Sequence, residues 1–339
     1  MKHRTPARVL VTGGAGYVGS HIVLHLVEAG HDVVVYDNLS TGHAWAVLGA
    51  PLVVGDLAER DRLRGLLEVG RFDAVIHCAA HIWVGESVRE PGRYYLTNAA
   101  NAFGLFALAA EAGVPCVLHS STAAVYGQPE APLIDEETPL APINPYGASK
   151  MMAERALLDI ARACGQRVAI LRYFNVAGAD REARIGEATP ANTHLVKVAL
   201  ETALGLRPSM RVNGTDYPTP DGTCIRDYVH IEDLAAAHLR TLEALLEGAR
   251  DLVLNCGYGH GYSVREVLDT VRAVTGIDLP VEEGPRREGD PPVLVAANAR
   301  IRRELGWEPR FDDLTAIVAS AWLWEQRLQA RFGRCRRTR

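Results

Sequence analysis

The sequence lacks two features that would mark a membrane protein or a nucleic-acid-binding protein. It has no run of about 20 apolar residues, the length that a membrane-spanning helix needs. It has no excess of positive charge either, because 41 Asp and Glu residues outnumber 36 Lys and Arg residues and the net charge is -5. We therefore expect no membrane and no nucleic acid among its partners.

Cysteine pairs with redox or metal-binding spacing are also missing. The six cysteines lie at residues 78, 116, 164, 224, 256 and 335, and none of them forms Cys-x-x-Cys. His21 and His25 are spaced one helical turn apart, but Ile22 stands where a zinc-protease helix needs glutamate. We expect reduced thiols, no metal, no secretory leader and a cytoplasmic protein.

Short β-branched runs alternate with helical patterns over the first half of the 339 residues. The runs that predict strands are apolar throughout, which is typical of a parallel sheet covered by helices on both faces. They are ARVLVTG, DVVVYD, PLVVGD, DAVIHCAA, PCVLHSS and VAILRYFN. The sequence therefore predicts an α/β fold with a doubly wound parallel (Rossmann) sheet.

The alternation breaks in the second half, where Gly, Pro, Asn and Thr become frequent. We expect residues 1–176, joined by residues 223–256, to form the Rossmann domain. Residues 177–222 and 257–330 are expected to form a smaller C-terminal substrate lobe. The basic residues 331–339 are expected to be a disordered tail.

A glycine-rich turn follows the first predicted strand. Gly13, Gly16 and Gly19 have the spacing G-x-x-G-x-x-G, and a helical pattern begins there. Glycine allows the tight turn and a close backbone approach, and N–H groups at a helix start bind pyrophosphate. Asp37 ends the second strand, where a carboxylate accepts from a ribose 2′-hydroxyl. No arginine follows in DNLSTGH, so the pattern favours NAD over NADP; the structural alternatives are a ligand-free turn and a turn-forming Asp37.

A tyrosine–lysine pair opens a long predicted helix. Tyr146 and Lys150 are four residues apart in YGASK and therefore share a helix face. The Lys150 ammonium is expected to stabilise the Tyr146 phenolate and to lower its pKa. Only three of the 36 basic residues are lysines, so a chance Tyr-x-x-x-Lys pair is uncommon. The pair predicts a tyrosine that exchanges a proton with a sugar hydroxyl, and the alternative is a surface pair.

The stretch SSTAAVYG, residues 120–127, has two interpretations. It is either the end of a buried strand or the edge of a catalytic site. Tyr126 has no basic residue at helical spacing, so we interpret it as packing or as part of the substrate wall, not as a base.

Together these segments resemble the extended short-chain dehydrogenases/reductases. Within them the sequence is similar to the UDP-glucose 4-epimerases (UDP-galactose 4-epimerases) over residues 8–325. The segments RYFNVAGAD and DGTCIRDYVH are specific to that branch, whereas the glycine motif and Tyr-x-x-x-Lys are shared more widely. The other matching segments are TGGAGYVGSH, DNLSTGH, VGESV, SSTAAVYG, NPYGASK and PRREGD.

The resemblance implies an isomerase that uses NAD to epimerise UDP-glucose and UDP-galactose at C4 through a transient 4-keto sugar. Tyr146 would take the proton of the 4-hydroxyl, Thr122 would hydrogen-bond the sugar oxygen, and Lys150 would tune Tyr146 and bind the nicotinamide ribose. The implied cofactor residues are Gly13, Gly16, Tyr17, Val18, Gly19, Asp37, Asn38, Asp56, Leu57, Ala79, Asn98, Lys150 and Phe174. The implied substrate residues are Thr122, Tyr146, Asn175, Leu195, Arg226, Tyr228, Arg287 and Asp290. The family also implies a homodimer that pairs the helices at 99–112 and 147–164.

Four positions depart from the family pattern. Ile82 stands where many relatives have a lysine near the nicotinamide ribose, and Asn213 replaces a usual phenylalanine near the uracil. His194 stands where some relatives have asparagine. Leu294 occupies a position often filled by tyrosine or a smaller residue, and its bulk, less than that of tyrosine, leads to the hypothesis that a 2-acetamido sugar is admitted.

The alternatives differ in what they need beside the hydroxyl of Thr122. Related dehydratases carry an acid directly after this position, but Ala123 and Ala124 stand here and neither can help to expel water. A non-catalytic NAD-binding sensor can lose the tyrosine or the lysine, and this chain keeps both. A 4-epimerase of a UDP-pentose or a UDP-N-acetylhexosamine is the alternative closest to the favoured function.

Overall fold

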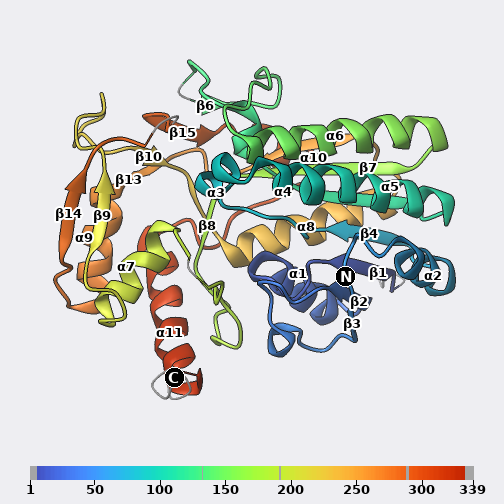
Figure 1. The fold of residues 1–339 in the computed structure, drawn as a ribbon, viewed down its shortest axis with the longest axis horizontal. Helices are drawn as coiled ribbons and strands as arrows, with labels where there is room; N and C mark the ends of the chain where they lie inside the picture. The colour runs from blue at the N-terminus through green and yellow to red at the C-terminus, as the bar shows by residue number, and fades with distance from the viewer. Residues whose placement is uncertain (1–5, 132, 191, 288–289, 333–339) are drawn as a thin grey trace.

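A seven-stranded parallel sheet forms the centre of the computed structural model, which describes residues 6–131, 133–190, 192–287 and 290–332 (Figure 1). The strand order is β12-β7-β5-β4-β1-β2-β3, and every neighbouring pair is parallel. The strands are β1 (Arg8–Thr12), β2 (Asp32–Asp37), β3 (Leu52–Val54), β4 (Ala74–His77), β5 (Cys116–Thr122), β7 (Arg167–Tyr173) and β12 (Leu252–Cys256). The doubly wound sheet predicted from the sequence is confirmed.

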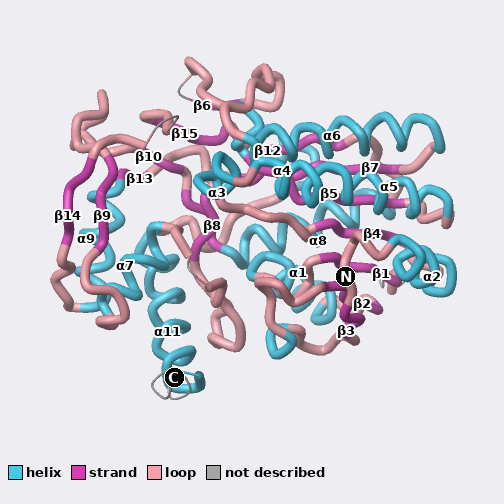
Figure 2. Tube along the Cα trace, in the orientation of Figure 1, coloured by secondary structure: helices cyan, strands magenta, loops and turns pink. Residues whose placement is uncertain are grey.

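Helices cover both faces of this sheet, as Figure 2 shows. Successive side chains of a strand point to opposite faces, so Val9 and Val11 of β1 share one core and Leu10 belongs to the other. The first core is completed by α1 (Tyr17–Glu28) and α8 (Ile231–Leu246), and the second by α2 (Arg60–Gly70), α5 (Ala102–Glu111) and α6 (Pro145–Cys164). Burial on both faces is the reason that the strands are apolar throughout.

A smaller lobe is built from later segments, at the left of Figure 1. Its helices are α7 (Leu195–Ala203), α9 (Val264–Thr275) and α11 (Leu314–Phe332), and β9 (Met210–Asn213) pairs with β14 (Val281–Gly284). A four-stranded sheet contains β13 (Tyr262–Ser263), β10 (Ile225–Arg226), β15 (Val293–Ala296) and β6 (Leu133–Ile134), and β8 (Asn175–Ala177) pairs with β11 (Tyr228–His230). The lobe helices share the first core with α1 and α8.

Short elements follow the strands at their carboxyl ends. They are η1 (Ala44–Ala46), α3 (Val84–Arg89), α4 (Pro91–Tyr94), the π-helix η2 (Tyr95–Asn101), η3 (Ala123–Tyr126) and, after β15, α10 (Ala299–Leu305). Because the sheet is parallel, the turns after β1, β2, β4 and β5 meet at one edge, where ligands of such sheets bind.

The C-terminal segment differs from the sequence prediction at its start. Arg331 and Phe332 of the predicted disordered tail are the last residues of α11, and residues 333–339 lie outside the described residues. Among the helices that the structure describes, none combines the length and the apolarity needed to cross a membrane.

Candidate active site

The glycine turn after β1 brings backbone segments into close contact. Gly13 has a φ of 73°, and a Cβ added to it would lie 2.5 Å from the Ala79 nitrogen. A Cβ on Gly19 would lie 2.1 Å from the Gly13 oxygen. Gly16 precedes α1 without a side-chain cap, so the first N–H groups of this helix keep their capacity to bind an anion. This cradle, which any larger residue would fill, fits the pyrophosphate of a dinucleotide.

Asp37 connects the glycine turn to the loop after β2. It is 8% exposed, and its two carboxylate oxygens accept from the Ala15 and Leu39 nitrogens at 2.9 and 2.8 Å. Each oxygen retains a lone pair that a ribose hydroxyl could use, so the turn-forming role leaves room for a binding role. Nearby, the Asn38 side chain donates to Asp56 at 2.6 Å.

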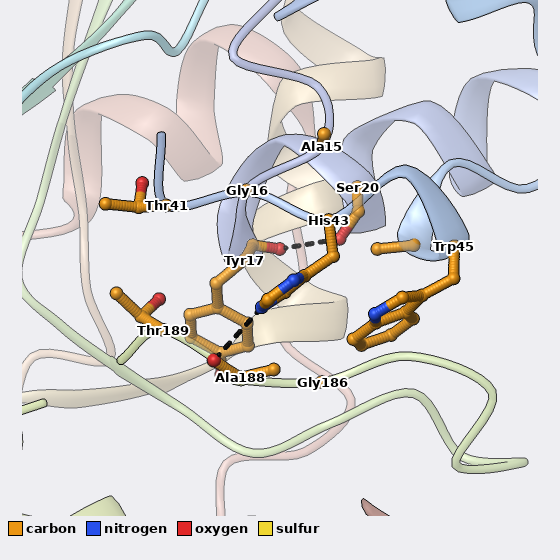
Figure 3. A pocket seen from close by; sticks show the side chains of 11 residues that line it. Ala15, Gly16, Tyr17, Ser20, Thr41, His43, Trp45, Gly186, Ala188 and Thr189 are labelled. Carbon is orange, nitrogen blue, oxygen red and sulfur yellow. Dashed lines mark hydrogen bonds between the residues drawn. The ribbon is translucent and has the colours of Figure 1, made fainter. Parts of the chain in front are cut away.

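A segment of the lobe covers the start of α1. The Tyr17 hydroxyl donates to the Gly178 oxygen at 2.7 Å, and His43 Nε2 lies 3.2 Å from the Ala188 oxygen. Figure 3 shows the small pocket that results, with Ala15, Gly16, Tyr17 and Ser20 from the glycine turn and α1 on one side. Thr41, His43, Trp45, Gly186, Ala188 and Thr189 complete its labelled lining. The Tyr17 side chain therefore joins the lobe to the glycine turn.

The remaining cofactor candidates line or support this edge of the sheet. Asn98 is buried, and its amide exchanges hydrogen bonds with the His81 backbone at 2.8 and 2.9 Å. It therefore fixes the loop after β4, which contains Ala79. Leu57 is buried in the second core, Val18 packs against the first, and Phe174 is buried beside Ala123 and Tyr126.

Thr122 and Tyr146 meet where β5 ends and α6 begins. Thr122 is the last residue of β5, and its hydroxyl accepts from the Ala124 nitrogen at 3.2 Å. Asn144 caps α6 by accepting from the Gly147 nitrogen at 2.9 Å. A Cβ on Gly147 would lie 2.4 Å from the Ala124 oxygen, so the helix start packs directly on this turn. The stretch 120–127 is thus both a buried strand end and the edge of the candidate site.

The ionisation of Tyr146 differs from the sequence prediction. Burial raises the pKa of Tyr146, and a side-chain hydrogen bond with Thr122 lowers it in part. The Lys150 ammonium, which was expected to lower this pKa, donates to the Ser120 oxygen at 2.6 Å. Burial lowers the pKa of Lys150 to about 8, although Cys78 and Glu154 act in the opposite direction. The spacing correctly put both residues on one helix face, but burial decides the direction of the tyrosine pKa.

The candidate substrate residues are spread over the lobe side of the site. Asn175 begins β8, Leu195 begins α7, and Tyr228 begins β11. The Arg226 guanidinium is buried and forms an ion pair with Asp290. Burial raises the pKa of Tyr228.

Arg287 has a neutral partner instead of a carboxylate. When the Asn213 amide is oriented with its oxygen toward Arg287, it accepts from Nε and Nη2 at 3.2 and 3.1 Å. The guanidinium is thereby oriented without being neutralised. Asn213, which we noted as a departure from the family, therefore has a defined contact in this chain.

A buried polar network that the sequence pattern did not reveal lies behind the candidate site. It links Ser121, Glu154, Arg172, Tyr126 and Asn255, each at most 5% exposed. Its one visible signal is the glutamate placed four residues after Lys150 on the predicted helix. Tyr126 is buried in it, and burial raises its pKa to about 12, so its interpretation as a packing residue agrees with the structure.

Comparisons with known proteins match nearly the whole chain. Residues 9–257 match the model of the NAD dependent epimerase/dehydratase family. A UDP-glucose 4-epimerase from Azospirillum brasilense is 52% identical, and the alignment covers 96% of this chain and 94% of that protein. The crystal structure of UDP-glucose 4-epimerase from Brucella ovis in complex with NAD is 43% identical, with a TM-score of 0.91 and coverage of 94% and 98%. The UDP-Glc/GlcNAc 4-epimerase of Campylobacter jejuni is also 43% identical, with a TM-score of 0.84 and coverage of 95% and 99%.

Proposed function

Because the chain belongs to the NAD-dependent epimerase/dehydratase family, and is an isomerase that acts as a UDP-glucose 4-epimerase, we propose which of its residues carry the reaction. The observation that carries the proposal is that Thr122 ends β5 where the start of α6, with Tyr146, packs on the turn that follows it, while Lys150 donates to Ser120 of the same strand. Ala123 and Ala124 follow Thr122 directly, so neither position offers an acid for elimination.

Proton transfer is assigned to Tyr146. When bound, NAD would supply the redox chemistry at C4 of the sugar, and its oxidation state would be unchanged over a complete turnover. Tyr146 accepts the proton of the 4-hydroxyl and later returns it, while Thr122 hydrogen-bonds the same sugar oxygen. Lys150 lies one helical turn after Tyr146, and its hydrogen bond to the Ser120 oxygen fixes the position of its ammonium. To accept that proton Tyr146 must be a phenolate, so positive charge in the assembled site has to offset the burial that raises its pKa.

Cofactor and substrate are held by different parts of the chain. We propose that residues 1–176 and 223–256 bind NAD through Gly13, Gly16, Gly19 and the other candidates named above. Residues 177–222 and 257–330 form the lobe that binds the UDP-sugar, and Thr122, Tyr146 and Arg226 contribute to the same site from the other part of the chain. Arg287, whose neutral partner leaves its charge available, contacts the diphosphate, and Arg226 contributes from the buried pair with Asp290.

The test uses purified protein without added NAD. It is incubated with UDP-galactose, UDP-glucose, UDP-xylose and UDP-N-acetylglucosamine, and the epimers are then separated. We expect interconversion of UDP-galactose and UDP-glucose. Protein that contains NAD but converts none of these sugars would contradict the proposal.

We propose that Leu294 helps to determine which UDP-sugars the site accepts. It lies in β15 and packs against the cluster of Ala123, Tyr126 and Phe174, beside the catalytic edge. We expect turnover of UDP-N-acetylglucosamine by the natural chain. In Leu294→Tyr, the added ring should lower kcat/KM for this sugar about 10- to 200-fold, the range that pocket size usually gives, and change that for UDP-galactose much less.

Leu133→Tyr is the matched control for this substitution. Leu133 lies on the neighbouring strand β6 but is exposed, so an added ring there meets solvent. Both sugars should be converted as in the natural chain. Equal losses for the two sugars in Leu294→Tyr would argue against a role in selection.

Retention of NAD is expected to depend on Trp45. Its ring stacks on His43 at 5.0 Å and meets Trp324 at 5.7 Å, while Trp324 Nε1 donates to the Glu187 oxygen at 3.0 Å. These contacts hold the lobe segment over the glycine turn. Trp45→Ala should weaken NAD binding by about 0.5–1.5 kcal/mol, the worth of an aromatic pair. The measurement is the NAD content of the protein after repeated gel filtration.

The control for Trp45→Ala is Trp322→Ala, on the same helix as Trp324. Trp322 packs against the first core and does not line the pocket. Its removal should leave the NAD content unchanged. Equal retention in Trp45→Ala and the natural chain would show that these contacts do not close the site.

A cytoplasmic homodimer is the assembly that we propose. Exposed apolar side chains support it, because Leu96 of η2 and Met152 of α6 are 61% and 43% exposed on adjacent elements. Gly104, on the helix at 99–112, offers no open surface to a partner, since Arg60 of the same chain already occupies the space beside it. Ala99 is likewise buried within the chain.

A further inference from the structure

A buried ion pair joins α6 to β7 behind the catalytic edge. Glu154 is 2% exposed and Arg172 5%. Arg172 Nε lies 3.1 Å from both carboxylate oxygens of Glu154, and Nη2 lies 2.6 Å from Oε2. Because two guanidinium nitrogens face the two carboxylate oxygens, the pair fixes both the distance and the relative orientation of α6 and β7.

The same carboxylate contacts the strand that carries Thr122. The Ser121 hydroxyl donates to Glu154 Oε1, and Thr122 is the next residue of β5. On the helix, Tyr146, Lys150 and Glu154 are spaced at intervals of four residues and lie on one face. Glu154 therefore contacts the strand of Thr122 from the helix of Tyr146.

The far end of the network holds the turn after Thr122. Arg172 Nη1 donates to the Tyr126 hydroxyl at 2.9 Å, and that hydroxyl donates to Asn255 at 2.7 Å. The guanidinium also lies 5.1 Å from the centre of the Tyr126 ring. Tyr126 ends the short helix η3, which begins directly after Thr122. Glu154 therefore holds the end of β5, and Arg172 and Asn255 hold the turn that follows it.

A buried ion pair is weak evidence for stability, because desolvation offsets much of the attraction, and apolar residues can replace such a pair. What the Glu154–Arg172 pair contributes instead is one fixed placement of α6 relative to β7. We propose that Glu154 is a positioning residue for the epimerisation, whose carboxylate holds β5 with Thr122 and α6 with Tyr146 in one arrangement. This inference rests on the function proposed above.

Glu154 also acts on the charge of Lys150. The titratable groups that act on this ammonium are Cys78 and His77 from the β4 side, His119 from β5 and Glu154 from α6, whose partner Arg172 lies on β7. Burial raises the pKa of Cys78 to about 11 and lowers that of His77 to about 3, and it lowers the pKa of His119 well below its usual value. These three are neutral near pH 7, so the Glu154 carboxylate is the anion of this set that favours protonated Lys150.

The main variant is Glu154→Gln, which keeps the shape of the side chain and removes its charge. We expect kcat with UDP-galactose to fall by up to about 10²-fold, the effect of a misplaced reacting group, while KM changes little. Activity of the natural chain should decline as the pH rises through about 8, where Lys150 loses its proton. Without the carboxylate the Lys150 pKa falls, so this decline should move to lower pH.

Two further variants separate positioning from folding. Ser121→Ala removes the link to β5 and leaves the ion pair intact, so it should lower kcat with a nearly unchanged Tm. Glu154→Gln/Arg172→Met leaves no unpaired buried charge and should fold, yet it should still lose kcat. Glu325→Gln is the matched control, because Lys197 and Glu325 form an equally buried pair in the lobe. It should lower Tm and leave kcat and the pH profile unchanged.

The outcomes distinguish this inference from the function on which it rests. A natural chain that binds NAD but does not convert UDP-galactose would overturn the proposed function. If the natural chain is active, and Glu154→Gln lowers Tm as Glu325→Gln does while kcat and the alkaline decline stay unchanged, Glu154 is a structural residue and the inference is wrong.

Discussion

Tyr146→Phe is expected to lower kcat for UDP-galactose by roughly 10²- to 10⁴-fold, the usual contribution of a positioned acid–base group. The substitution removes only the hydroxyl that we propose to exchange the substrate proton. The ring keeps its edge-on contact with Tyr94, whose centroid lies 6.4 Å away, so the fold should persist. The measurement is the initial rate of UDP-glucose formation, together with the NAD content of the purified variant.

Tyr126→Phe is the control for the loss of a phenol near the same edge. Its hydroxyl belongs to the buried network with Arg172 and Asn255, so its loss should cost stability and lower the rate far less than Tyr146→Phe does. NAD should be retained in both variants. Full activity of Tyr146→Phe would refute the assignment of the proton transfer.

Gly19→Ala is expected to have the second large effect, on folding and on NAD binding together. A Cβ at this position would lie 2.1 Å from the Gly13 oxygen and 2.8 Å from the Gly13 carbonyl carbon, which are backbone atoms of the turn itself. The turn and the start of α1 must separate to admit it. We expect the free energy of unfolding to fall by about 1–3 kcal/mol, as in other overpacked sites, and NAD to be lost on gel filtration.

Gly65→Ala separates this steric effect from the general effect of replacing glycine. Gly65 lies inside α2, and a Cβ there would meet nothing within 4 Å. It should raise the free energy of unfolding by about 0.5–1 kcal/mol, because alanine favours the helix, and leave the NAD content unchanged. Denaturant unfolding of both variants is the measurement. A Gly19→Ala chain with natural stability and full NAD content would contradict the close packing at this turn.

Elements with local signals were predictable from the sequence. Six of the seven parallel strands follow from apolar runs, since a sheet covered on both faces leaves no polar side, whereas β12 was not among the predicted strands. The cradle at Gly13 and Gly19 follows from three glycines between a strand and a helix. Tyr146 and Lys150 were placed on one face by helix geometry alone.

Electrostatic details of the site were not predictable in this way. The helix spacing suggested that Lys150 lowers the pKa of Tyr146, yet burial raises this pKa and the ammonium is turned to the Ser120 oxygen. Desolvation depends on every neighbouring atom, and those neighbours come from several elements. Spacing along one helix cannot report them.

The sequence by itself determined the fold class, the glycine turn and the shared helix face of Tyr146 and Lys150, because each depends on residues close together in the chain. The tertiary structure decided how these side chains are held. Glu154 and Arg172 are 18 residues apart, and Tyr126 and Asn255 are 129 residues apart. Their contacts exist only because β5, β7, β12 and α6 pack side by side, and no local pattern of residue types predicts these contacts.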